Sequence, residues 1–322
     1  QFHSWKPWHT SLSHSACPSV GMPGKFLQPA VIDYRDGILA KLREFPDILA
    51  NTTILTDMQT VCGIDGKRFV DKMPPNTSVG FPLGGPKRAF LTLLDPTNHD
   101  SFACPAELDP KFWEEAGKME ALYYEGKRAY PFFKGCLKDE PTPLSKDKVR
   151  VFRAAPIVLQ IGIRKFFLPV ARFLSMNPLV AECAVGINSH GPEWEQLAEH
   201  MRKFGEDRII AGDYSKYDLR MPAQLVLTAF EVMIQIAKWS KNYSAKDVRI
   251  MRALALEVAH PMVAYNGDLL QFHGTNPSGQ NMTVYVNSIV NAILHRLGFF
   301  AVCAKGELDS GDAKFTQSLG RD

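Results

Sequence analysis

The sequence lacks most of the features that would assign it at once to a common class of protein. Its six cysteines are scattered, without a C-x-x-C pair and without clustered histidines. Zinc sites and a disulfide framework are therefore disfavoured, and a reducing cytosol is the simplest interpretation. No run of about 18 consecutive apolar residues occurs, which predicts that no helix spans a membrane. An initiator methionine and a signal-peptide pattern are also missing, so we expect a piece of a longer polypeptide or a partial clone.

The composition favours a packed protein with one localised patch of positive charge. The chain has 322 residues, of which 45% are hydrophobic, enough for one large domain or two ordinary ones. Between Lys138 and Arg172, eight basic residues stand against three acidic ones. The net charge of this segment is therefore +5, and that of the remaining residues is −2, which gives the total of +3. A basic zone in a near-neutral protein fits a channel for phosphates. For Arg164, Lys165 and Arg172, a solvated helix face is the alternative.

Turn and cap signals predict a mixed order of helices and strands. Helices are expected over 110–126, 157–175, 192–204, 222–240 and 244–260, and a longer one from Gly279 to about Val302. Strands are expected over 149–152 and 208–213, and a hairpin over 262–273 around Asn266-Gly267. This order is neither a regular βαβ series nor a repeat array, and it indicates an α/β chain of the α+β type.

Two carboxylates lie in the segment 212–218, which reads Gly-Asp-Tyr-Ser-Lys-Tyr-Asp. The predicted strand before it delivers Asp213, and Asp218 follows five residues later. A carboxylate at the end of a buried strand must be paired, hydrogen-bonded or bound to a cation. Mg²⁺ takes oxygen ligands and needs only one or two carboxylates besides substrate phosphates. Asp213 is therefore a candidate metal ligand, with a turn-capping Asp as the alternative.

A loop rich in glycine, proline and serine opens the long helix. It runs from Gly274 to Gly279, and Thr283 and Asn287 follow in the helix. Free N–H groups and the helix dipole would favour an anion at Ser278 and Gly279. The pattern P-S-G alone is weak, whereas G-x-x-P-S-G-x-x-x-T-x-x-x-N-S is specific. Taken alone, Asn287 would be read as an interior helix residue that bonds a neighbouring backbone group.

Together, these two segments resemble motifs A and B of the RNA-dependent RNA polymerases of picorna-like positive-strand RNA viruses. Upstream, Lys138-Asp139-Glu140-Pro141 and residues 148–152 look like motif F of that family. Residues 77–82 match the T-S-x-G-x-P of motif G. The four motifs also occur in the family's order, G, F, A and B, which makes the match stronger than any one of them.

The resemblance implies a role for each matching residue. Asp213, Asp218 and Asn287 form the implied catalytic set, in which Asp213 binds the metal and the other two hold the 2′-OH of the incoming ribose. The residues implied to bind substrate are Lys138, Lys148 and Arg150 at the triphosphate, Ser278, Gly279 and Thr283 near template and nucleotide, and Thr77 and Ser78 at the template entrance. Arg153 is left open. The implied cofactor is Mg²⁺, with Mn²⁺ as the alternative.

The implied fold is a right-hand polymerase with fingers and a partial palm, without a thumb. The expected division is 1–175 fingers with motifs G and F, 176–222 palm with motif A, 223–278 fingers insertion and hairpin, and 279–322 palm with the motif B helix. The Gly-Asp-Asp hairpin of motif C is missing from the chain. Asp312 lies in too polar a context for a buried strand and is interpreted as part of a loop. We therefore expect the chain to be truncated before motif C.

The implied function is template-directed nucleotidyl transfer from NTPs by a two-metal mechanism, which replicates a positive-strand viral RNA genome. Expected partners are an RNA template and primer, nucleoside triphosphates and other segments of a viral polyprotein. The expected location is replication complexes in the host cytoplasm. With one metal carboxylate instead of a pair, the chain alone is expected to be inactive. The alternatives are a reverse transcriptase-like polymerase and a non-catalytic RNA-binding protein that keeps the basic channel.

Overall fold

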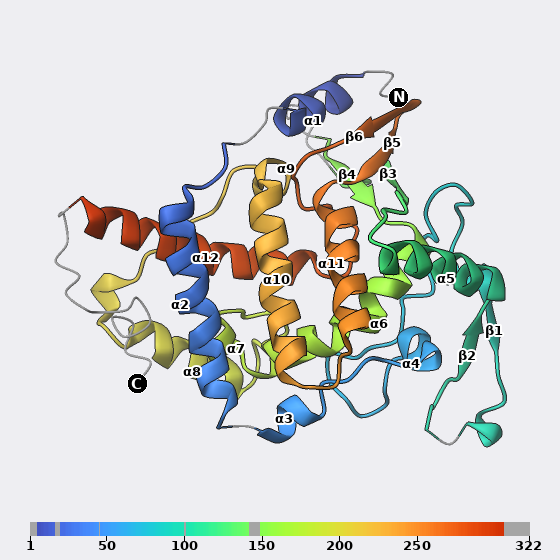
Figure 1. Cartoon of the computed structure of the whole chain (residues 1–322), viewed down its shortest axis with the longest axis horizontal. Coiled ribbons are helices and arrows are strands. Elements are labelled where there is room, and N and C mark those ends of the chain that lie inside the picture. Colours follow the sequence, from blue (N-terminus) through green and yellow to red (C-terminus); the bar gives the residue numbers. More distant parts are fainter. Residues whose placement is uncertain (1–4, 17–19, 45, 100, 142–148, 306–322) are drawn as a thin grey trace.

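Five long helices form the body of the structure: α2 (Gly24–Leu42), α6 (Ile157–Met176), α10 (Ala223–Trp239), α11 (Ala245–Ala259) and α12 (Thr283–Ala304). The computed structural model describes residues 5–16, 20–44, 46–99, 101–141 and 149–305. In Figure 1, α2, α10 and α11 run side by side, α12 crosses them on the far side, and α6 passes below. A short turn joins the end of α10 to the start of α11, so these two helices pack as an antiparallel pair.

The sequence determines these helices through apolar content and through caps. Fifteen of the 20 residues of α6 are buried, which makes it a central helix packed on several sides. At the start of α11, the Ser244 hydroxyl accepts from the Asp247 N–H (3.2 Å), and the Asp247 carboxylate accepts from the Ser244 N–H (2.7 Å). This capping box satisfies two backbone donors that a helix start otherwise leaves unpaired.

The other helices of the described residues surround this body. They are α1 (Lys6–Ala16), α3 (Pro46–Ala50), α4 (Asp57–Cys62), α5 (Pro110–Tyr124), α7 (Pro178–Ala181), α8 (Pro192–Arg202) and α9 (Tyr217–Arg220), with 3₁₀ turns η1 (Lys87–Phe90), η2 (Pro96–Asn98) and η3 (Glu206–Arg208). In Figure 1, α1 lies above the sheet and α5 lies beside it.

The main sheet has four strands in the order β4-β3-β5-β6. Its strands are β3 (Phe132–Leu137), β4 (Val151–Ala154), β5 (Met262–Tyr265) and β6 (Asp268–Gln271). β3 pairs antiparallel with β4 and parallel with β5, so the sheet joins two parts of the chain that are more than a hundred residues apart. A separate two-stranded sheet pairs β1 (Leu91–Leu93) with β2 (Ala106–Leu108).

Most of the predicted elements are confirmed. The helices expected over 110–126, 157–175, 192–204, 222–240 and 244–260 are α5, α6, α8, α10 and α11. The hairpin is also present, and both turn residues, Asn266 (φ 52°) and Gly267 (φ 105°), have the positive φ that its two-residue turn requires. The strand expected over 149–152 lies two residues further on, as β4.

One predicted element is wrong, and the start of another is misplaced. The strand expected over 208–213 is absent, and residues 209–214 are exposed, Ile210 at 90%. An isolated strand leaves its backbone groups unpaired, and no strand among the described residues lies beside this segment. The long helix begins at Thr283 instead of Gly279, because the backbone of Gly279 pairs with the chain that leaves β4.

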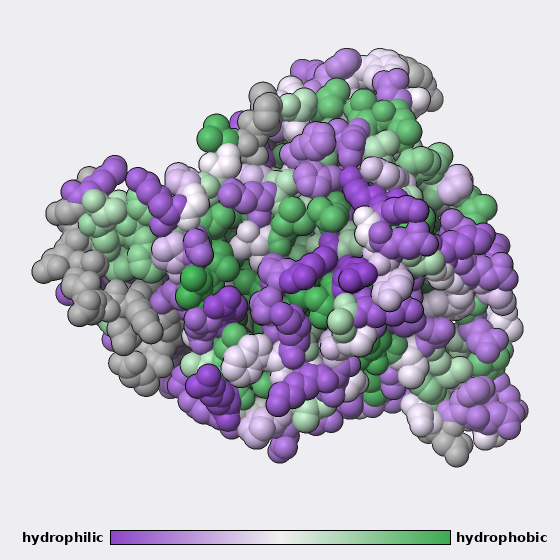
Figure 2. All heavy atoms as spheres, viewed as in Figure 1, coloured by the Kyte–Doolittle hydropathy of each residue, from purple (hydrophilic) through white to green (hydrophobic). Residues whose placement is uncertain are grey.

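The helix α12 is also the one helix in the described residues that is long and apolar enough to cross a membrane by length and composition, with 33% of that stretch buried. The sequence criterion of an unbroken apolar run did not detect it. Its N-terminal half packs inside the protein, and its C-terminal half is partly exposed. Figure 2 shows apolar residues, in light green, gathered over that end.

A wholly buried arginine fixes α12 against α2. The Arg296 guanidinium is 0% exposed and donates to Asp33 on α2 (2.8 Å) and to Glu182 after α7 (2.7 and 2.8 Å). A buried charge is tolerated only when it is paired and hydrogen-bonded. Arg296 therefore holds three separate parts of the chain in one arrangement.

We expect Arg296→Ala to lower the free energy of unfolding by about 3–5 kcal/mol, because it leaves the Asp33 carboxylate buried without its partner. Urea denaturation followed by circular dichroism measures the change. The matched control is Arg252→Ala, which breaks an exposed pair with Glu231 (2.9 Å) and should cost about 0–1 kcal/mol. Equal losses in the two variants would contradict the role of the buried pair.

A second buried charge, Lys87, follows the predicted motif G segment. It is 2% exposed, and its ammonium donates to the Thr77 hydroxyl (2.6 Å). Burial first, and the neighbouring charge of Arg164 second, lower the pKa of Lys87 to about 8. In the unfolded chain, the same group keeps its ordinary, higher pKa. Between these two values, the unfolded state binds a proton that the folded state does not.

Stability should therefore increase as the pH rises from about 8 toward 10, and the cost of burying the charge is fully present below that range. Relative to Lys87→Met, the wild-type chain should gain about 2 kcal/mol in unfolding free energy between pH 7 and pH 10, at about 1.4 kcal/mol for each pKa unit. Urea titrations at the two pH values test this. Lys118→Met, at a side chain 72% exposed, is the control and should change nothing. Identical pH dependence for wild type and Lys87→Met would refute the shift.

Candidate functional site

The loop before α12 is bound to the chain that leaves β4. The Gly279 N–H donates to the Arg153 carbonyl (3.0 Å), and the Gly279 carbonyl accepts from the Ala155 N–H (3.2 Å). A Cβ atom at position 279 would lie 2.5 Å from the Arg153 carbonyl oxygen, so only glycine allows this approach. The N–H that was expected to face an anion is therefore engaged within the protein.

The predicted motif G loop is bound to the same piece of chain. The Ile157 N–H, at the start of α6, donates to the Val79 carbonyl (2.8 Å). Thr77 and Ser78 lie on the exposed side of this loop, where the Ser78 hydroxyl accepts from the Gly80 N–H (3.0 Å). Residues of the predicted motifs F, G and B thus meet around the backbone between β4 and α6.

Arg153, which the sequence left open, is a buried structural residue. It is 3% exposed and donates to the hydroxyls of Thr275 (2.5 Å) and Ser15 (2.6 Å), with its guanidinium 4.0 Å from the ring centroid of Phe272. Burial lowers its pKa to about 10, so it remains charged at neutral pH. Its contacts join α1, β4 and the loop before α12, and they leave it no access to a bound triphosphate.

Asn276 connects the two predicted ribose-selecting residues. Its backbone N–H donates to the Asp218 carbonyl (2.7 Å). Its side-chain amide donates to the Asn287 oxygen (2.9 Å) and to the Thr283 carbonyl (3.0 Å). In addition, the Tyr217 hydroxyl donates to the Asn287 carbonyl (3.1 Å). Asp218 on α9 and Asn287 on α12 are therefore held next to one loop.

Asp213 lies in the exposed segment before α9, and the described part of the chain contains no group of three His, Cys, Asp or Glu side chains that could hold a metal ion. The next residue, Tyr214, donates from its hydroxyl to the Asn291 oxygen on α12 (2.9 Å). Its ring stacks on Tyr217, with the centroids 4.4 Å apart. These contacts place the segment that carries Asp213 along the same side of α12 as Asn287, one helical turn away.

The two exposed cations of the predicted motif F share one carboxylate. Arg150 donates to both oxygens of Glu140 (2.8 and 2.9 Å), and Lys138 also pairs with Glu140. Glu140 chiefly, and Asp218 more weakly, raise the pKa of Arg150. The charge of Arg150 therefore reaches the neighbourhood of Asp218. Lys148 lies outside the described residues.

The two remaining predicted residues, Ser278 and Thr283, differ in their surroundings. Ser278 is exposed, whereas the Thr283 hydroxyl donates to the Pro277 carbonyl (2.8 Å) and holds the loop. Sequence reasoning missed Asn276 and Glu140. The available signal for Asn276 was a polar residue inside a glycine- and proline-rich loop. The available signal for Glu140 was an acid between two predicted phosphate-binding cations.

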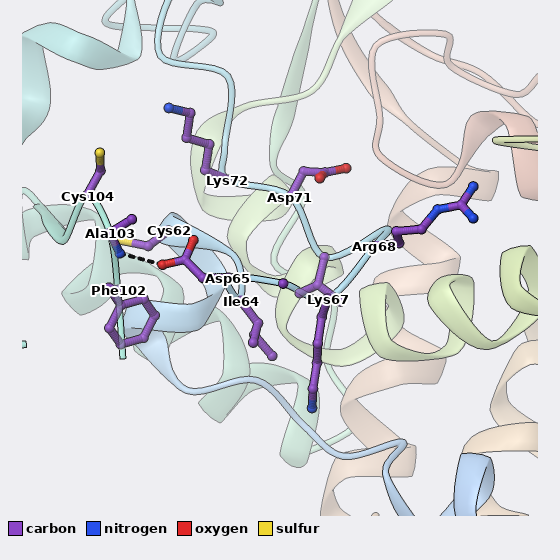
Figure 3. A pocket seen from close by; sticks show the side chains of 12 residues that line it. Cys62, Ile64, Asp65, Lys67, Arg68, Asp71, Lys72, Phe102, Ala103 and Cys104 are labelled. Carbon is purple, nitrogen blue, oxygen red and sulfur yellow. Dashed lines mark hydrogen bonds between the residues drawn. The ribbon is translucent and has the colours of Figure 1, made fainter. Parts of the chain in front are cut away.

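A cavity of about 540 Å³ lies elsewhere, between α4 and the segment before β2. Figure 3 shows Cys62, Asp65 and Ala103 close together, with Lys67 and Arg68 directed away from them. The Ala103 N–H donates to the Asp65 carboxylate. None of the predicted site residues lines this cavity, so it is separate from the candidate site.

Comparison with known proteins identifies the family of the chain. A family model described as viral RNA-dependent RNA polymerase matches residues 28–316. The genome polyprotein of deformed wing virus is 28% identical over 255 residues, 75% of this chain and 9% of the polyprotein. The replicase polyprotein of Drosophila C virus (strain EB) is 27% identical over 271 residues, 78% of this chain and 15% of that protein. The chain thus spans a small part of the curated relatives that it matches.

A solved structure, the Sicinivirus 3Dpol RNA-dependent RNA polymerase, has a similar fold. Its TM-score is 0.67 at 20% identity, over 89% of this chain and 55% of that chain. The predicted fold class is confirmed, and the partial coverage agrees with part of a right-hand polymerase. Since the family model covers most of the sequence, the chain belongs to the viral RNA-dependent RNA polymerases, of the type found in picorna-like viruses.

Proposed function

We propose that this chain supplies the fingers and part of the palm of an RNA-directed RNA polymerase that copies a positive-strand viral genome. The observation that carries this proposal is the bridge that Asn276 forms between Asp218 and Asn287, beside the charge of Arg150. Groups suited to a sugar hydroxyl and to phosphates therefore share one region. In the proposed reaction, a primer 3′-OH attacks the α-phosphate of an NTP and pyrophosphate leaves.

In this proposal, Asp218 and Asn287 select ribose. A carboxylate accepts the proton of the 2′-OH, and an amide N–H donates to its oxygen. A site built on such bonds rejects a deoxynucleotide, because its own polar atoms would then remain unpaired. The resulting preference for ribonucleotides separates this proposal from a reverse transcriptase-like polymerase, which would favour deoxynucleotides.

Arg150 and Lys138 would bind the triphosphate, with Lys148 as a third cation. The fork of Arg150 suits bidentate phosphate contact, and Lys138 supplies a point charge. Glu140 occupies both cations in the free chain, so an incoming triphosphate would take over these contacts. Thr77, Ser78, Ser278 and the loop that Gly279 fixes would line the path of the template, with contacts to phosphates instead of base edges.

Asp213 would hold a divalent cation, Mg²⁺ or Mn²⁺. Its exposed carboxylate fits such an ion as one ligand among waters and phosphates. When bound, the ion would lower the charge at the reacting phosphates. The two-metal mechanism needs a second carboxylate, and no group of three His, Cys, Asp or Glu side chains occurs among the residues that the structure describes. By resemblance, the chain would bind an RNA template and primer and would act with other polyprotein segments. It would do so in replication complexes in the host cytoplasm.

Asp213→Asn in the polymerase that contains this chain should reduce primer extension on an RNA template by more than about a hundredfold. Even an outer partner of a metal ligand is worth about 10- to 100-fold, and the ligand itself is worth more. RNA binding, measured by fluorescence anisotropy, should be unchanged. Asp207→Asn, at an exposed carboxylate upstream in the same segment, is the control and should keep full synthesis. Full synthesis by Asp213→Asn would instead support a non-catalytic RNA-binding protein.

The 322-residue chain alone should show no primer extension, whereas a version extended by about 150 residues, a typical domain-sized addition, should be active. The physical reason is the single carboxylate available to the cation. Parallel assays with equal concentrations of folded protein, checked by circular dichroism, measure the difference. Full activity of the short chain would rule out the need for a second carboxylate from outside it.

A further inference from the structure

Three side-chain amides before and within α12 form an ordered chain of hydrogen bonds. The Met282 N–H donates to the Gln280 oxygen (2.6 Å), and the Gln280 amide nitrogen donates to the Asn276 oxygen (3.2 Å). The Asn276 amide nitrogen then donates to the Asn287 oxygen (2.9 Å). Asn276 is 1% exposed and Gln280 is 6% exposed, so these bonds form away from water.

Both ends of this chain have a fixed polarity. The backbone N–H of Met282 can only donate, so the Gln280 oxygen must face it. The backbone carbonyl of Thr283 can only accept, so the Asn276 amide nitrogen must face it (3.0 Å). These two constraints settle the orientation of every amide in the chain. Asn287 is consequently held with its oxygen toward Asn276 and its NH₂ group on the opposite side.

The orientation of Asn287 decides what it offers to a sugar. A 2′-OH has one proton to donate and an oxygen that accepts. With the NH₂ group outward, Asn287 would offer a donor beside the acceptor that the proposed function assigns to the Asp218 carboxylate, and the two would complement this hydroxyl. With the amide reversed, two acceptors would compete for one proton, and the hydroxyl oxygen would have no donor.

We propose that Asn276 and Gln280 are positioning residues that set the donor side of Asn287 toward the ribose and thereby determine the preference for ribonucleotides. This inference rests on the proposed polymerase function. Neither side chain touches the nucleotide. Burial enforces the arrangement, because a reversed amide would leave unsatisfied polar atoms where water cannot reach them. The Asn276 N–H donates to the Asp218 carbonyl (2.7 Å), and this bond also keeps Asp218 close to Asn287.

The test is Asn276→Asp in the full polymerase that contains this chain. The new carboxylate keeps the size of the side chain and still accepts from Gln280, but it repels the Asn287 oxygen and favours the reversed amide. We expect the ratio of kcat/KM for an NTP to that for the matching dNTP to fall by about tenfold or more, the value of one lost hydrogen bond. The loss should fall on the NTP, with dNTP incorporation changed by less than about twofold.

Gln280→Glu is the second variant, and it acts one step further from the sugar. It retains the bond from the Met282 N–H and repels the Asn276 oxygen, so the ratio should move in the same direction. Asn242→Asp is the matched control. Like the Asn276 amide, the Asn242 amide donates two hydrogen bonds, here to the backbone carbonyls of Ala50 (2.9 Å) and Thr52 (3.1 Å), but it lies after α10, away from the loop. It should lower the melting temperature without changing the ratio.

The two proposals fail in different ways. If the wild-type polymerase makes no RNA, the proposed function is wrong and this inference falls with it. If the wild type makes RNA but Asn276→Asp and Gln280→Glu keep its ratio of NTP to dNTP incorporation, only the inference is overturned. A fall in the ratio that Asn242→Asp reproduces would also overturn it, because general destabilisation would then explain the change.

Discussion

The backbone between β4 and α6 is the part on which the candidate site depends. Arg153 and Ala155 hold Gly279 on one side of it, and Ile157 holds Val79 on another. Backbone hydrogen bonds of this kind do not depend on which side chains line the site, so they fix positions while leaving the exposed residues free to bind. The loops that carry Ser78 and Ser278 are in this way bound to the same backbone segment, although two hundred residues separate them in the sequence.

Local signals were sufficient for the elements whose stability is local. The capping box at Ser244, the proline-led start of α5 and the Asn266-Gly267 turn act within a few residues, and each of these elements formed as predicted. The segment 208–213 shows the limit of such reasoning. Its apolar pattern is that of a strand, but a strand needs a neighbour for its backbone groups, and periodicity in one segment says nothing about the presence of that neighbour.

The residues of the candidate site could be selected from the sequence, but the contacts that join them could not. Asp218, Asn287 and Arg150 could be selected because they match motifs A, B and F of the family that the sequence resembles. The residues that bring them together could not be, since the value of Asn276 lies in contacts that exist only after folding. Arg153, whose role the sequence left open, is the opposite case. A cation in a basic segment suggests phosphate binding, yet burial among Thr275, Ser15 and Phe272 makes it a support for the loop.

In the proposed function, Glu140 would keep the two exposed cations ordered before a nucleotide binds. Arg150 and Lys138 are exposed and would repel each other, and one carboxylate between them removes that repulsion at little cost, because exposed pairs exchange easily with water. In that proposal, a triphosphate would displace Glu140, because it carries more negative charge than a carboxylate and offers more acceptor oxygens. The same weak pairing that contributes little to stability would then keep the cations in place for phosphate.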